Sequence, residues 1–307
     1  MPSRTEYFGY QFTNLGPLTT TYEPPASCTT ATTDRIYFAN AKNLGIGYGS
    51  ASCDGPETVG KCYPSGATYD SLLSSRATYR DQGLLKYFSP GVACPKGWTT
   101  AGTLAHGEKT DSAEKAGVFT TEPFPYPAYI MEPEQIWLNL LEPSETLAYC
   151  CPSGWESNSG GGCFSSIEPL ISATATYSEY CIAYGPFSAG VSVHTVDGTS
   201  VATPLISWES ATDLTTTTRA ISILMDAQPT EVFDVAVARY LPGVALVYKP
   251  SDVKKAKDSG DEESEESKDA KADDDNGALT LNGGSFVPLV AVLFSMLVGA
   301  GMLAPGF

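Results

Sequence analysis

Hydrophobic and polar residues alternate with a period near two over much of residues 167–248, a pattern typical of strands with one buried face. The stretch is rich in Thr, Val, Ile, Ala and aromatic residues. It predicts four strands, over Leu170–Tyr184, Val201–Trp208, Thr216–Met225 and Glu231–Tyr240. We expect the last to form a hairpin with Val244–Tyr248 across Leu241-Pro242-Gly243. This part of the chain therefore predicts an antiparallel β domain.

The N-terminal half is predicted to be rich in loops. Residues 1–27 are polar and aromatic, and their prolines and threonines favour extended backbone. Asp70–Leu85 has apolar residues near helical spacing and predicts a helix, and Ile136–Leu141 predicts one short helical turn. Thr146–Tyr149 predicts a strand. Five prolines between residues 123 and 143 argue against long regular elements there.

Three short segments share one design, a cysteine followed by proline and glycine. They are Cys62-Tyr63-Pro64-Ser65-Gly66, Cys94-Pro95-Lys96-Gly97-Trp98 and Cys151-Pro152-Ser153-Gly154-Trp155. Proline and glycine at this spacing predict tight turns that present the cysteine at a fixed corner. Trp98 and Trp155 can then pack beside a sulfur atom, and any exposed ring would suit stacking against a sugar.

The chain has eight cysteines, an even number confined to its first 181 residues. They are Cys28, Cys53, Cys62, Cys94, Cys150, Cys151, Cys163 and Cys181. This clustering among turn residues favours disulfides over free thiols, and the spacing lacks the paired C-x2-C pattern of a zinc site. Cys53 with Cys62 and Cys151 with Cys163 are the local pairs we expect. A bridge between the adjacent Cys150 and Cys151 would be strained.

Residues 249–275 differ sharply in composition, with eleven acidic residues, six basic residues and no aromatic residue. Such a segment buries too little apolar area to fold, so it predicts a disordered spacer with a root-mean-square span of about 30 Å. Flexibility of this kind would separate the preceding domain from whatever follows it.

The C-terminal segment 276–307 has no charged residue. Phe286–Ala304 is apolar and long enough to cross a bilayer as a helix. Small residues beginning at Asn276, a short polar spacer and the apolar tail follow the order of a glycolipid-anchor signal, with Asn276 as the attachment residue. The alternative is a retained transmembrane helix. Met1–Pro25 has no apolar signal region, so we expect a signal peptide upstream of Met1.

The formal net charge of −17 opposes binding to phosphate backbones, so nucleic acid is not an expected partner. The only histidines, His106 and His194, lie outside any catalytic motif, and Glu132 and Glu134 flank a proline as solvated glutamates often do. The sequence therefore predicts no catalytic residue, no cofactor and no metal site. We divide the chain into residues 1–27, 28–181, 182–248, 249–275 and 276–307.

The order of these motifs resembles a group of functionally uncharacterised, cysteine-rich surface proteins of filamentous fungi. The resemblance covers most of residues 15–214. It is carried by Leu15-Gly16-Pro17-Leu18-Thr19-Thr20-Thr21, Pro24-Pro25-Ala26-Ser27-Cys28, the Cys62 turn, Ser89-Pro90-Gly91-Val92-Ala93-Cys94-Pro95-Lys96-Gly97-Trp98, Cys150-Cys151-Pro152-Ser153-Gly154-Trp155 and Leu205-Ile206-Ser207-Trp208-Glu209. It implies a cell-surface location and no activity. Relatives often have a further cysteine after each Trp turn, where this chain has Thr100, Ala101, Glu156 and Ser157.

Together these features predict an ectodomain held at the plasma membrane through its C-terminal tail. Binding, adhesion or cell-wall sensing is the expected role, with a wall polysaccharide or a protein as the ligand. The alternatives are a secreted carbohydrate-active enzyme and a structural coat protein.

Overall fold

The computed structural model describes residues 2–29, 35–54, 58–75, 82–108, 112–120, 130–184, 190–207, 215–226 and 235–265. Strands connected mostly in antiparallel fashion dominate these residues, so the prediction of a mainly β chain with disulfides is confirmed. Met1–Glu263 form one compact unit, in which the cysteine-rich region and the β-rich region share the same sheets.

The larger sheet has seven strands, and every neighbouring pair in it is antiparallel. In spatial order they are β14 (Thr215–Ala220), β11 (Glu179–Tyr184), β4 (Asn43–Ser50), β3 (Ile36–Asn40), β15 (Val235–Pro242), β10 (Gly162–Pro169) and β9 (Glu156–Ser157). Phe38 and Val237 lie opposite each other in β3 and β15 and are fully buried. Ala39 and Ala236, the next pair along, are buried as well, so both faces are covered here, whereas the period-two pattern predicted one buried face.

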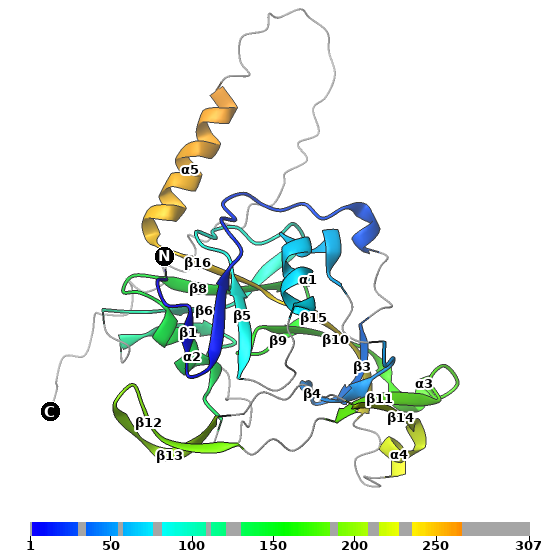
Figure 1. The fold of residues 1–307 in the computed structure, drawn as a ribbon. Helices are drawn as coiled ribbons and strands as arrows, with labels where there is room; N and C mark the ends of the chain where they lie inside the picture. Colours follow the sequence, from blue (N-terminus) through cyan, green and yellow to red (C-terminus); the bar gives the residue numbers. More distant parts are fainter. Residues whose placement is uncertain are drawn as a thin grey trace, which may run out of the picture. The chain divides into compact units, whose positions relative to one another are not determined.

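A second group of strands surrounds β8. The four-stranded antiparallel sheet has the order β16 (Val244–Tyr248), β8 (Thr146–Pro152), β6 (Trp98–Ala105) and β7 (Glu114–Gly117). A three-stranded sheet has the order β1 (Glu6–Tyr7), β2 (Tyr10–Asn14) and β5 (Gly83–Tyr87), with β2 and β5 parallel. Phe88 connects the two, because its N–H donates to the Ala245 carbonyl and its carbonyl accepts from Val247 N–H, both at 2.8 Å. Figure 1 shows β5 next to β16, which it also contacts in the structure.

The expected hairpin across Leu241-Pro242-Gly243 is wrong. β15 pairs with β3 and β10, whereas β16 pairs with β8, so consecutive strands belong to different sheets. Gly243 does not close a turn; its N–H donates to the Gly161 carbonyl at 2.8 Å, and its carbonyl accepts from the Tyr63 hydroxyl at 2.9 Å. Contacts with distant segments therefore satisfy the backbone that a hairpin would have satisfied locally.

Several predicted elements are split in the structure. The helix expected over Asp70–Leu85 corresponds only in part to α1 (Gly66–Ser74): residues 76–81 lie outside the described ranges, and residues 83–85 belong to strand β5, which pairs with β2. The strand expected over Leu170–Tyr184 begins with helix α3 (Leu170–Ala173) and continues as β11 only at Glu179. Likewise, β14 is followed by helix α4 (Ile221–Asp226). In each case pairing with a remote strand, which local periodicity does not report, sets the boundary.

Other local predictions are confirmed. The helical turn at Ile136–Leu141 corresponds to α2 (Pro133–Leu140), and Thr146–Tyr149 is the first part of β8. The strand expected over Val201–Trp208 is β13 (Thr199–Ser207), which pairs with β12 (Val191–Val196); Trp208 lies outside the described residues. Single 3-10 turns occur at Ala26–Thr29 and Gly60–Cys62.

The first part of the expected spacer is helical, since α5 covers Pro250–Glu265. Pro250 stands in its first turn, and the Asp252 carboxylate accepts a hydrogen bond of 2.9 Å from Lys249 N–H, which caps the helix start. Lys and Glu residues favour helix even where no apolar face exists. The prediction of a disordered spacer considered only the small apolar area and not this helix propensity. The described ranges contain no helix that is long and apolar enough to cross a membrane. Phe286–Ala304 and Asn276 lie outside those ranges.

Candidate functional site

Turns form in all three segments, but each begins one residue later than predicted, so the cysteine precedes the turn and does not open it. Trp98 N–H donates to the Pro95 carbonyl and Trp155 N–H donates to the Pro152 carbonyl, each at 3.0 Å. Gly97 and Gly154 occupy the third turn position with φ of +80°, which only glycine adopts without strain. In the remaining copy Gly66 N–H donates to the Tyr63 carbonyl at 3.0 Å.

The two Trp turns lie side by side at one end of β6 and β8. Trp98 is opposite Pro152 in the strand register, and Ser153 N–H donates to the Gly97 carbonyl at 3.0 Å. Both tryptophans are half-buried, and the Trp98 ring centroid lies 6.4 Å from that of Tyr63 in a core cluster. Trp98 therefore contributes to packing, and the turns act as a scaffold for the residues around Tyr63.

All eight cysteines form bridges, which are Cys28–Cys62, Cys53–Cys181, Cys94–Cys150 and Cys151–Cys163. The expected pair Cys151–Cys163 is confirmed. Cys150 and Cys151 have different partners, as predicted, because consecutive residues of β8 point to opposite faces of the sheet.

The expected pair Cys53–Cys62 is wrong. Cys53 follows β4, and β4 lies beside β11, where Cys181 is opposite Ser50. This pairing brings Cys53 to Cys181 across 128 residues of sequence. Cys62 instead ends a 3-10 turn and bonds to Cys28. Sequence proximity misled the prediction because the sheet decides which cysteines meet.

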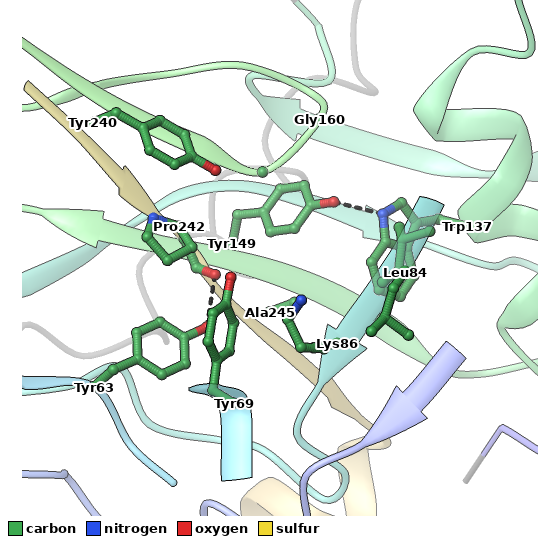
Figure 2. Close-up of a pocket in the computed structure, with 13 residues that line it drawn as sticks. Tyr63, Tyr69, Leu84, Lys86, Trp137, Tyr149, Gly160, Tyr240, Pro242 and Ala245 are labelled. Carbon is green, nitrogen blue, oxygen red and sulfur yellow. Dashed lines mark hydrogen bonds between the residues drawn. The ribbon is translucent and has the colours of Figure 1, made fainter. Parts of the chain in front are cut away.

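A cavity of about 140 Å³ lies where β5, β8, β15 and β16 converge, and four tyrosines surround it (Figure 2). We call it the tyrosine cavity. Its lining residues are Tyr63, Tyr69, Leu84, Leu85, Lys86, Trp137, Tyr149, Gly160, Gly161, Tyr240, Pro242, Gly243 and Ala245. Five of these residues are aromatic and three are glycines, and the tyrosine hydroxyls, the Lys86 ammonium group and backbone atoms such as the Gly243 carbonyl are its polar atoms.

Two of the tyrosines are held in place by hydrogen bonds. The Tyr63 hydroxyl donates to the Gly243 carbonyl at 2.9 Å, and Trp137 Nε1–H donates to the Tyr149 hydroxyl oxygen. The Tyr63 ring also packs against the Tyr69 ring, with centroids 4.8 Å apart. These contacts fix the cavity wall before any ligand arrives.

The other two tyrosines, Tyr69 and Tyr240, present hydroxyls that have no hydrogen-bond partner within the described part of the chain. Tyr69 is only 8% exposed. Among the described residues, Nε of Arg239 is the only side-chain nitrogen or oxygen that is buried and has no hydrogen-bond partner. The Tyr69 hydroxyl also has no partner among them, so it must be accessible. The Tyr69 hydroxyl therefore opens into the cavity, and Figure 2 shows Tyr240 above it near Gly160.

A tyrosine hydroxyl is protonated at neutral pH, and burial moves the pKa of these hydroxyls further upward. Desolvation raises the pKa of Tyr63 and Tyr69 well above the ordinary value, and it also raises the pKa of Tyr240, against the opposing effect of the Arg35 charge. A protonated tyrosine both donates and accepts a hydrogen bond. At neutral pH the cavity thus offers uncharged donors.

Among the described residues of the lining, the only charged side chain is that of Lys86, whose Nζ lies 4.3 Å from the centroid of the Tyr69 ring. Asp70 is next to Tyr69 in α1, but its carboxylate accepts hydrogen bonds from Val59 N–H at 2.8 Å and Gly60 N–H at 2.9 Å. None of the lining residues that the structure describes has a carboxylate. Although the whole chain has a net charge of −17, the positive charge of Lys86 makes this cavity unfavourable for cationic ligands.

A glycine-rich turn closes one side of the cavity. Gly161 N–H donates to the Asn158 carbonyl at 3.0 Å, and Gly162 N–H donates to Asn158 Oδ1 at 3.1 Å. Gly161 has φ of +80°, and a Cβ there would come within 2.8 Å of the Tyr149 ring. The turn therefore packs directly on Tyr149, and the glycine run makes this contact feasible.

Other polar residues singled out by sequence lie elsewhere. His106 is 8% exposed with Nδ1 2.6 Å from the Gly107 carbonyl, and His194 is exposed on β12. Glu132 is exposed, and Glu134 Oε1 forms an ion pair of 2.6 Å with Lys115. Within the described ranges no three His, Cys, Asp or Glu residues gather as metal ligands would.

Sequence reasoning missed the tyrosine cavity. Tyr63, Tyr69, Tyr149 and Tyr240 come from four separate segments, and no spacing pattern links them. The one available signal was the high tyrosine content of 17 residues. The sequence does not indicate which of these tyrosines lie close together in space.

Comparison with protein-family models, with curated proteins and with solved structures finds no match for this chain.

Proposed function

We propose that this chain is the disulfide-braced ectodomain of a cell-surface protein and that it acts by binding a ligand. The four bridges support an extracellular or secreted location, because disulfides persist in oxidising compartments. The resemblance to cysteine-rich surface proteins of filamentous fungi agrees with this location. A wall polysaccharide or a surface protein is the ligand we expect.

The observation that carries the proposal is the tyrosine cavity. Hydrogen bonds from Tyr63 and Trp137 hold its aromatic side chains in place. The hydroxyls of Tyr69 and Tyr240 line the cavity and are available to a ligand. A concave, largely preformed site with a few polar groups is the usual architecture of ligand binding. Preorganisation lowers the entropy lost when a ligand binds.

Attachment to the membrane is the second part of the proposal and rests on the sequence. The apolar segment Phe286–Ala304 follows small residues at Asn276, in the order of a glycolipid-anchor signal. We propose that Asn276 carries the lipid and that the apolar segment is removed.

Expression of the full chain behind a working signal peptide tests both parts. We expect surface labelling of intact cells, no free thiols, and release of the protein by phosphatidylinositol-specific phospholipase. Substituting Asn276→Leu together with Gly277→Leu should abolish release, because bulky residues do not fit an attachment site. Surface protein that resists the phospholipase and still carries Phe307 would favour a retained helix. Protein confined to the cytosol with reduced cysteines would contradict the proposal.

A further inference from the structure

We propose that the tyrosine cavity binds one pyranose-sized sugar unit, with the Tyr69 and Tyr240 hydroxyls as hydrogen-bond partners of its hydroxyl groups. The proposal rests on the ligand-binding function above and names both the site and the chemical class of the ligand. It moves recognition away from Trp98 and Trp155, the residues that the sequence suggested for sugar stacking.

The size of the cavity sets the size of the ligand. Its volume is about 140 Å³, and an apolar cavity of about 150 Å³ in another protein accommodates benzene. One six-membered ring therefore fits and two do not. Tyr240 is 41% exposed, so the cavity opens to solvent beside this residue and the substituents of a ring can extend outward there.

The chemistry of the wall selects a ligand with apolar faces and several hydroxyls. Aromatic rings such as Trp137 and Tyr149 can contact the C–H face of a sugar ring. A purely apolar ligand would leave the Tyr69 hydroxyl buried without a hydrogen-bond partner, which disfavours its binding. A cation would meet Lys86. A polyhydroxylated ring satisfies all of these groups.

The surrounding covalent structure makes the site rigid. Tyr149 immediately precedes Cys150 and Cys151, which bond to Cys94 on one side and Cys163 on the other. Tyr63 follows Cys62, which bonds to Cys28. Three bridges therefore anchor the segments that carry these tyrosines, so little conformational entropy is lost on binding.

Two conservative variants test the assignment of the hydroxyls. Tyr69→Phe and Tyr240→Phe each remove one hydroxyl that has no partner in the described part of the chain, so the fold should be unaffected. One hydrogen bond contributes about 0.5–1.5 kcal/mol, so each variant should weaken sugar binding by roughly 2- to 13-fold. Tyr180→Phe is the matched control, because Tyr180 is equally buried, at 5% exposure, but packs on Phe38 away from the cavity.

The experiment titrates the secreted full chain with methyl glycosides and short oligosaccharides of glucose, N-acetylglucosamine, mannose and galactose, followed by NMR and calorimetry. Cyclohexanol, a ring with a single hydroxyl, is the ligand control. We expect at least one sugar to bind, cyclohexanol not to bind detectably, and affinity to fall in Tyr69→Phe and Tyr240→Phe but not in Tyr180→Phe. Melting curves check that all three variants remain folded.

Three results would overturn the inference and distinguish it from the proposed function. Sugar binding that is unchanged in both cavity variants would place the sugar site elsewhere and leave the ectodomain a binding protein. Retention of the chain on cells or wall material, with no sugar of the panel bound, would reject the sugar class. Absence of both kinds of binding would reject the proposed function as well.

Discussion

Removing the Cys53–Cys181 bridge should loosen one edge of the large sheet. β11 meets β4 at a single register pair, Cys181 with Ser50, whereas it meets β14 along six pairs. The bridge is therefore a covalent tie at a point where backbone pairing is short, in addition to the packing of Tyr180 on Phe38. With the other bridges closed, the loop that Cys53–Cys181 closes runs along the chain to Cys94, crosses the Cys94–Cys150 and Cys151–Cys163 bridges and ends at Cys181. This loop has about 60 residues, which corresponds to about 4 kcal/mol of chain-entropy stabilisation.

The assay is thermal unfolding of the Cys53→Ala/Cys181→Ala variant. For a unit of this size about 4 kcal/mol corresponds to a Tm decrease of roughly 8–16 °C. Amide hydrogen exchange should accelerate in β11 and β14 more than in β3 or β15. Ser50→Ala, an exposed position opposite Cys181, is the control and should change stability by less than about 0.5 kcal/mol. A Tm decrease below about 2 °C with unchanged exchange in β11 would refute this reasoning.

Three further predictions concern the bridges, the tyrosines and the glycine turn. Under mild reductant the Cys151–Cys163 bridge should be cleaved last, because both cysteines are at most 1% exposed; alkylation and peptide mapping over time would show any earlier loss. Tyr63 and Tyr69 have pKa values raised by burial, so the unfolded chain loses these protons first as pH rises above about 10. Stability should then fall by up to about 1.4 kcal/mol per pH unit for each tyrosine, and unfolding free energies that stay constant between pH 10 and 11 would contradict this. Gly161→Ala should destabilise more than Gly154→Ala, since both glycines have φ of +80° but only at Gly161 does a Cβ approach a ring; equal losses of Tm would refute the packing argument.

Local patterns predicted the parts of this fold that depend on local sequence. Alternation identified β13, β15 and β16, and proline with glycine identified the turns before Trp98 and Trp155. Both signals arise from preferences that act within a few residues.

Nonlocal pairing explains what the sequence did not predict. The chain continues from β15 into β16 without reversing, because each strand finds its partners elsewhere, and Cys53 follows β4 to Cys181 for the same reason. The tyrosine cavity is a further case, since its residues meet only after β5, β8, β15 and β16 are assembled. Propensity and spacing contain no information about such contacts between remote segments.

Retention of the secreted full chain on intact cells and on isolated wall polysaccharide, before and after reduction of its disulfides, tests the proposed binding function most directly. We expect saturable retention that excess unlabelled protein displaces and that disappears after reduction, because the tyrosine cavity depends on segments held by Cys94–Cys150 and Cys151–Cys163. Absence of retention on either material, or retention that persists unchanged in the reduced and unfolded chain, would contradict a disulfide-braced binding ectodomain.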